Sequence, residues 1–289
     1  MVEFNPTQYE DNPLKKYFRQ AKVYITLPSQ GKYWPAGTLD MPDNGELPVY
    51  AMTAKDELTM KTPDALLNGE ATVSVIQSCV PNIKNAWKLP SVDLDAVLIA
   101  IRLATYGDKM DINTTVPNIN VEKSYTLDLR QVLNSLVTNT FEDIFEINDM
   151  KVHLRPLTYE EFTEASMKTF EEQRIFALVN DDGIPDSEKI KKFNQSFMKL
   201  TELTVFTISK SISRIDVGDD SVTNPAHIQE FIENVDKSFY TELTEHLNAQ
   251  KDKFSIKPLE IHSTDEEIAE GAPAKWSVPI VFDQSNFFA

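Results

Sequence analysis

The cysteine and the histidines are the side chains best suited to nucleophilic or metal chemistry in this sequence. Cys79 is the only cysteine, and it ends an apolar segment with no histidine nearby in the sequence. That placement is typical of a small buried side chain more than of a nucleophile, although residues distant in sequence can still meet in space. The histidines lie far apart, without a set of neighbouring ligands at metal-binding spacing: His153, His227, His246 and His262. We therefore predict no metal site.

Acidic residues supply the other candidate chemistry. The adjacent pairs Glu160/Glu161 and Glu171/Glu172 fall on predicted helix surfaces, where solvated carboxylates are usual. Residues 181–183 (DDG) and 218–220 (GDD) indicate turns, because neither continues into the alternating oxygen ligands of a calcium loop. Neither a Gly-x-Ser-x-Gly motif nor a glycine-rich phosphate loop is present. We predict no enzyme, no catalytic residue and no cofactor; a hydrolase that uses Cys79 or a carboxylate pair is the open alternative.

The charge of the chain narrows the classes of partner. The net charge is −17, and no cluster of Lys and Arg interrupts the acidic excess. Such a surface repels phosphate and anionic lipid, so we expect neither nucleic acid nor membrane as a partner, and proteins remain. The polar start of the chain does not resemble a secretory signal, and its longest apolar runs are much shorter than a membrane span. A single cysteine fits a protein that folds in a reducing cytoplasm.

The pattern of apolar residues predicts an α+β protein that is predominantly helical. Residues 1–20 form a polar N-terminal arm, and residues 21–110 a mixed α/β domain. Strands are expected at 22–27 and 48–53, and helices at 65–67, 71–79 and 91–107. The helix at 91–107 is apolar almost all round, which is typical of a helix buried on most sides. We place it at the centre of the N-terminal domain.

The rest of the chain divides into three further segments. Residues 111–157 form a small β-rich insert, with a polar connection at 108–122, a strand at 125–129, a short helix at 130–136 and a hairpin around Asn148-Asp149. Residues 158–257 form a helical bundle that begins with the capping box Thr158 to Glu161 and continues with apolar residues at steps of three and four from Ile190 to Ile212. Its last helix is expected at 224–247. Residues 258–289 form a solvated acidic linker, 260–271, and an apolar C-terminal tail.

Aromatic residues in loops and in the tail are the candidate sites for binding partners. Large aromatic side chains in irregular segments either plug the core or anchor an interface, because they bury much area at little cost in rotamer entropy. Both roles stay open at this point. The candidates are Tyr33, Trp34, Trp87, Trp276, Phe282, Phe287 and Phe288.

Several ordered motifs between residues 25 and 111, and the end of the chain, resemble one known family. The motifs are LPSQGKYW at 27–34, ELPVYAMTAKDE at 46–57, TPDALLNGEA at 62–71, SCVPNI at 78–83, DLD at 93–95, IRLATYG at 101–107 and FDQSNFF at 282–288. On these motifs the chain resembles the baseplate hub assembly proteins of T-even-type phages. The match covers about a third of the chain.

The resemblance implies a role in a contractile phage tail, in the baseplate hub or its assembly pathway, without catalysis. It implies other tail proteins as partners, namely hub subunits and the tape-measure protein, and a location in the host cytoplasm during assembly. A structural component would remain in the tail baseplate of the virion, whereas a transient assembly chaperone bound to the tape measure would leave. Both readings stay open.

Similar proteins carry cysteine pairs near the positions of residues 116–123 and 272–277, which suggests a small metal-binding ribbon. This chain has no cysteine in either segment. If the ribbon fold is kept here, hydrogen bonds and apolar packing must replace the metal.

Overall fold

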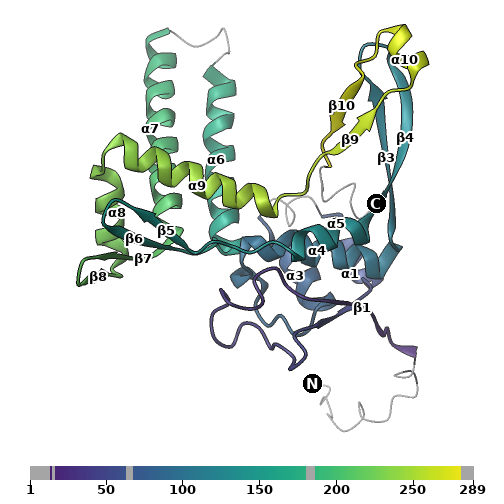
Figure 1. Ribbon diagram of the computed structural model, residues 1–289, viewed down its shortest axis with the longest axis horizontal. Coiled ribbons are helices and arrows are strands. Elements are labelled where there is room, and N and C mark those ends of the chain that lie inside the picture. The colour runs from purple at the N-terminus through teal and green to yellow at the C-terminus, as the bar shows by residue number, and fades with distance from the viewer. Residues whose placement is uncertain (1–13, 15–16, 63–67, 180–185, 281–289) are drawn as a thin grey trace, which may run out of the picture.

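The computed structural model describes residues 14, 17–62, 68–179 and 186–280. The chain is α+β, as predicted, and more of its described residues lie in helices than in strands. Two separate apolar cores form, with two projections beside them (Figure 1). The predicted division into five segments is not tested by this arrangement and stays a prediction. The predicted helix at 65–67 lies outside the described residues.

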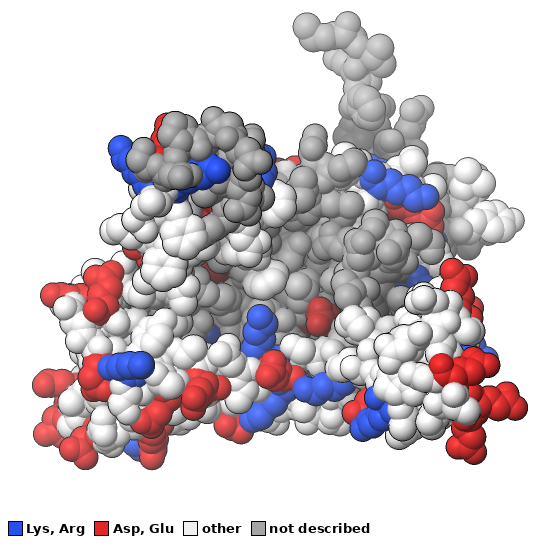
Figure 2. Space-filling model, turned by 90° about the horizontal axis from the view of Figure 1, so that it is seen from above, with Lys and Arg blue, Asp and Glu red and all other residues white. Residues whose placement is uncertain are grey.

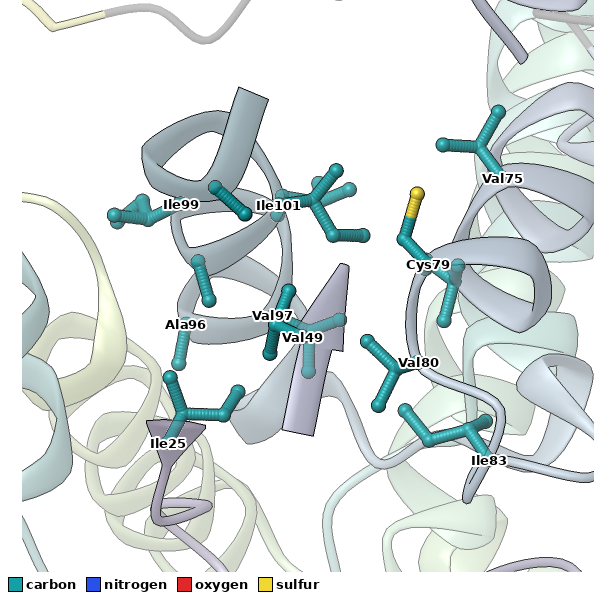
Figure 3. Packing of buried hydrophobic residues seen from close by; sticks show 14 of the residues in the cluster. Ile25, Val49, Val75, Cys79, Val80, Ile83, Ala96, Val97, Ile99 and Ile101 are labelled. Atoms are coloured by element: carbon teal, nitrogen blue, oxygen red, sulfur yellow. The ribbon is translucent and has the colours of Figure 1, made fainter. Parts of the chain in front are cut away.

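The first core surrounds one helix, α4. Its elements are β1 (Ala21–Ile25), β2 (Leu47–Tyr50), α1 (Ala54–Met60), α3 (Glu70–Cys79), η3 (Ala86–Lys88), α4 (Ser91–Tyr106) and α5 (Leu129–Val137). β1 and β2 pair antiparallel. Val97 and Ile101 of α4 face Val80 and Cys79, with Val49 of β2 beside them (Figure 3). The prediction of a buried helix at 91–107 is confirmed.

A long hairpin leaves the first core on one side. β3 (Lys109–Val116) and β4 (Val121–Asp128) pair over their whole length, and residues 117–120 form the turn. The sequence prediction of a polar connection at 108–122 was therefore wrong. Alternate residues of β3 are less exposed, but two threonines lie in the strand and blunt the apolar alternation that identifies strands.

The predicted acidic linker is also folded. β9 (Leu259–His262) pairs antiparallel with β10 (Lys275–Val278), and α10 (Asp265–Glu270) lies between them. α10 begins with a capping box, in which Thr264 and Glu267 satisfy each other's backbone amides, and it ends at Gly271 with φ of 111°. The prediction of a solvated linker at 260–271 was wrong, because the segment forms a paired strand and a capped helix; three of its five acids occupy the first turn of that helix, where they are stabilised.

The second core is built on a four-stranded sheet. Its antiparallel order is β5 (Ile144–Ile147), β6 (Met150–Leu154), β7 (Ile212–Val217) and β8 (Asp220–Val222). The predicted hairpin around Asn148 is confirmed. The strands β7 and β8 were not predicted, and Ile212 begins β7 where the sequence analysis placed it on a helix.

Helices α8 (Pro225–Asn234) and α9 (Lys237–Phe254) complete the second core. The predicted single helix at 224–247 is divided in two, because Val235 leaves the helical conformation and Asp236 accepts hydrogen bonds from two amides of α9. Phe239 and Leu243 of α9 are buried against Ile228 and Ile232 of α8.

The longest helices form the second projection. α6 (Tyr159–Val179) and α7 (Asp186–Lys210) stand side by side as a helical hairpin, and α9 crosses them (Figure 1). The predicted capping box is present: Glu161 accepts from the Thr158 amide at 3.0 Å, and Thr158 accepts from the Glu161 amide at 3.3 Å. The sequence leaves open a bundle of three long helices or a helical hairpin with a docked partner; here α6 and α7 pair, and α9 packs with the sheet in the second core.

Candidate protein–protein interface

The turn that carries Tyr33 and Trp34 is tightly folded. The Gln30 amide donates to the carbonyl of Leu27 at 2.9 Å, and the Lys32 amide donates to that of Ser29 at 3.0 Å. Gln30 and Gly31 both have positive φ, 53° and 79°, so the chain reverses sharply here. The turn holds its two aromatic side chains in fixed and different directions.

Trp34 points into the first core. Its indole Nε1 donates to Asp93 Oδ2 at 2.8 Å, and the same carboxylate accepts from the Ser29 hydroxyl at 2.5 Å and the Ser29 amide at 2.8 Å. Asp93 is fully buried, and burial raises its pKa to about 6 against the lowering effect of these hydrogen bonds. Trp34 therefore has an intramolecular partner, and its role in binding another protein stays a prediction.

Tyr33 lies in a groove between the two cores, which Trp34 also lines. Its ring meets that of Phe141 edge to face, with centroids 5.4 Å apart. The groove has a volume of about 360 Å³ and is also lined by Lys32, Asp143, His153 and Arg155. Lys32 pairs with Asp143 at 2.5 Å, and Arg155 pairs with Glu161 at 2.7 Å. Since the charged side chains that line the groove are paired with one another or with neighbours, the groove presents mainly aromatic and hydrogen-bonding surface to another protein.

Trp87 packs between the first core and α6. Its ring stacks on that of Tyr159, with centroids 5.7 Å apart and an angle of 23° between the planes. Next to this contact the Tyr159 amide donates to the carbonyl of Leu89 at 2.7 Å. Trp87 is partly buried against the first core. The contact fixes where α6 begins, and it gives Trp87 a packing role whether or not a partner also touches it.

Trp276 belongs to a distal module made of the β3–β4 and β9–β10 hairpins. Its ring lies edge to face with Tyr125 at 6.3 Å. Asn118 Nδ2 donates to the carbonyl of Gly271 at 3.1 Å, and Lys123 pairs with Glu267. The two hairpins of the distal module therefore meet, joined by a hydrogen bond, an ion pair and an aromatic contact. Phe282, Phe287 and Phe288 lie outside the described residues.

The candidate chemical groups are dispersed. Cys79 is buried, and burial together with the nearby Asp56 carboxylate raises the pKa of its thiol to about 12, so the thiolate is rare near neutral pH. His153 Nε2 lies 2.7 Å from Asp216 Oδ2 at the surface of the sheet. Among the described residues, no three His, Cys, Asp or Glu side chains lie close enough together to hold a metal ion.

The structure adds two features that the sequence analysis missed. Arg19, assigned to the polar arm, docks on the first core: its guanidinium donates to the carbonyls of Ala51 at 2.5 Å and Ser78 at 2.6 Å. No sequence signal distinguishes this arginine from its neighbours. The second feature is a set of exposed apolar side chains on the α6–α7 hairpin: Phe162, Met167, Phe170, Ile190, Phe193, Phe197 and Met198. For Ile190, Phe193 and Phe197 the helical spacing in the sequence predicts a packed bundle; the other side chains carry no such signal.

Comparison with known proteins gives the family of this chain. The family model described as T4 bacteriophage base plate protein matches residues 22–267, from β1 through the first part of α10. The chain belongs to this family. The match includes both cores and the α6–α7 hairpin, well beyond the motifs at 25–111, and the resemblance seen in the sequence is confirmed. No curated protein and no solved structure matches the chain.

Membership makes this chain a phage baseplate protein, and proteins of a baseplate act by contacting other phage proteins. Each helix in the described part of the chain falls short of the length or apolarity needed to cross a membrane. The surfaces available for contacts are the groove at Tyr33, the distal module and the α6–α7 hairpin.

Proposed function

We propose that this protein is a structural component of the baseplate hub of a contractile phage tail, and that it acts through protein–protein interfaces without catalysis. The match of residues 22–267 to the baseplate family carries the proposal. The apolar side chains exposed on α6 and α7 support it, because such surface is uncommon on a protein that works alone.

The proposed partners are hub subunits and the tape-measure protein. The net charge of −17 favours neutral or basic protein surfaces over nucleic acid. The protein would meet these partners in the host cytoplasm during assembly and then remain in the tail. Tyr33, Trp34, Trp87, Trp276, Phe282, Phe287 and Phe288 are the proposed partner-binding residues; of the four described ones, Tyr33 and Trp34 line an open groove.

Quantitative mass spectrometry of purified phage particles tests the proposal. We expect the chain at a fixed ratio to the hub subunits. Its absence from particles, together with its recovery on unassembled tape-measure protein from infected cells, would instead establish a transient assembly chaperone.

Deleting residues 286–289 tests the role of the C-terminal aromatics. We expect tail assembly to fail, while circular dichroism of the truncated chain keeps its helical signal. Normal assembly by the truncated chain would remove Phe287 and Phe288 from the proposed interface.

The hydrolase alternative receives no support from the geometry of its proposed groups. Cys79 is buried, and the high pKa of its thiol disfavours the thiolate that a nucleophile needs. Of the carboxylate pairs, Glu161 is bound by Arg155 and Glu172 by Lys199.

A further inference from the structure

The α6–α7 hairpin has a polar interior. Glu172 and Ser196 are buried between the helices, and Lys199 donates to Glu172 at 2.9 Å. The hydrogen bonds from Lys199 and Ser196 lower the pKa of Glu172. These polar groups occupy places between the two helices that large apolar side chains would otherwise fill. The large apolar side chains of the two helices must therefore be covered elsewhere or remain exposed.

The exposed side chains of α7 form a stripe that starts in the second core. Ile190, Phe197, Thr204 and Ile208 are separated by seven, seven and four residues, which places them on one face of the helix. Ile208 is 7% exposed, within the second core, whereas Phe197 is 60% exposed and Ile190 62%. We call these four residues the α7 stripe. The protein's own second core covers the stripe at Ile208, and the stripe extends beyond this core toward Ile190.

The surroundings of the α7 stripe are unusual for this molecule in their charge. α7 contains five lysines and three acids, a net charge of +2, whereas α6 beside it contains five acids and two bases, a net charge of −3; Lys199 of α7 is paired with Glu172 of α6. Three of the lysines, Lys189, Lys191 and Lys192, flank Ile190. Lys and Arg side chains gather at the end of the hairpin, whereas Asp and Glu dominate the edges of the body (Figure 2).

We infer that the α7 stripe binds an amphipathic helix of another protein, whose apolar face is flanked by Asp and Glu. Apolar contact would continue the second core outward, and the lysines of α7 would meet the acids of the partner. The stretch from Ile190 to Thr204 spans about 21 Å at 1.5 Å per residue, about four turns of a partner helix. A parallel contact between two copies of α7 fits less well, because it places Lys189, Lys191 and Lys192 against the same lysines of the second copy.

The inference rests on the proposed function only in that it takes the partner to be a tail protein. It is tested directly with a synthetic amphipathic helix of about 20 residues, with Leu on one face and Glu at the flanking positions. Fluorescence anisotropy would follow its binding to the full-length protein. A second peptide with Lys in place of each Glu measures the part played by charge.

We expect the Glu peptide to bind at least about ten-fold more tightly than the Lys peptide. Phe197→Asp and Ile190→Asp should each weaken the Glu peptide by about ten-fold or more, since each places a carboxylate on the apolar face. Leu58→Asp is the matched control, because Leu58 of α1 is 69% exposed and lies outside the hairpin. That control should bind like the unmodified chain.

Equal binding of the two peptides, no binding of either, or equal loss with Leu58→Asp would overturn the inference. Sedimentation of the protein alone covers another occupant: self-association that Phe197→Asp abolishes would assign the α7 stripe to a second copy of the chain. A chain found in particles at a fixed ratio, but unable to bind the Glu peptide, would leave the proposed function standing and remove this inference. Selective peptide binding by a chain absent from particles would do the reverse.

Discussion

The first core and the α6–α7 hairpin use their apolar residues in opposite ways. In the first core, α4 is buried on nearly all sides, and even a carboxylate, Asp93, is enclosed and given three hydrogen-bond donors. In the hairpin, polar groups lie between the helices and phenylalanines lie outside. The comparison separates the part of the chain that specifies the fold from the part that offers surface to others. Substitutions in the two regions should therefore have different consequences.

The largest effect on stability is expected at Ile101, at the centre of the first core. Ile101→Ala should lower the free energy of unfolding by about 2–5 kcal/mol, because the side chain is fully buried and its removal leaves a cavity. Urea unfolding followed by tryptophan fluorescence reports on this core, since Trp34 and Trp87 pack against it. Ile101→Val is the matched control and should cost about 0.5–1.5 kcal/mol. A loss below that of the control would mean that α4 is not tightly packed.

A smaller loss is expected at Asp93, which joins the aromatic turn to α4. Asp93→Asn keeps the size of the side chain but replaces one acceptor oxygen with a donor that faces Ser29 or Trp34. We expect a loss of about 1–3 kcal/mol and a changed Trp34 emission spectrum. Asp95→Asn, on the same helix, is the control for the spectrum, as the indole of Trp34 donates to Asp93. An unchanged emission maximum in Asp93→Asn would argue against the hydrogen bond from the indole.

Asp95 gives a test in which the expected change is stabilising. Burial raises its pKa to about 6, above the value near 3.8 expected in the unfolded chain. The neutral form is favoured in the folded state, so its stabilising contribution is complete below pH 3.8 and is lost as the pH rises through 6. The side chain introduced by Asp95→Asn is neutral at every pH. At pH 7 this variant should have a free energy of unfolding ~1–2 kcal/mol above that of the unmodified chain, and it should therefore unfold at a higher temperature. The difference should vanish near pH 4; a difference independent of pH would contradict the raised pKa.

The smallest effect on stability is expected in the hairpin. Phe197→Ala should change the free energy of unfolding by less than about 0.5 kcal/mol, because the ring is largely exposed. Thermal unfolding monitored by circular dichroism measures it, with Phe239→Ala as the buried comparison, which should cost about 3–5 kcal/mol. A large loss in Phe197→Ala would show that the ring is covered within the protein's own fold.

The same comparison explains which elements could be predicted from the sequence. α4 was identified because its residues are apolar all round, and the start of α6 because its capping box uses residue types that act locally. β3, β7 and β8 were missed because their alternation is interrupted by threonines, serines and aspartates, and their pairing depends on partners elsewhere in the chain. Periodicity showed that α7 has an apolar face, but it could not show whether this protein covers that face.

For the candidate binding residues, the sequence shows which side chains are aromatic but cannot show which way each side chain points in the fold. Tyr33 and Trp34 are adjacent in the chain and both line the groove, yet Tyr33 packs against Phe141 whereas Trp34 donates to a buried carboxylate. That difference is set by the positive φ of Gln30 and Gly31 and by the position of Asp93, which is distant in sequence. The contact of Trp87 with Tyr159 likewise depends on how α6 is attached to the first core.

The distal module can close only late in the synthesis of the chain. It joins residues near 118 to residues near 271, so everything between, including the second core and the helical hairpin, is enclosed in one loop of chain. A ribosome makes the first core, the β3–β4 hairpin and the second core well before it adds β10. The β3–β4 hairpin must wait for its partner until the rest of the protein has emerged, and the closed distal module therefore marks a chain translated at least as far as β10.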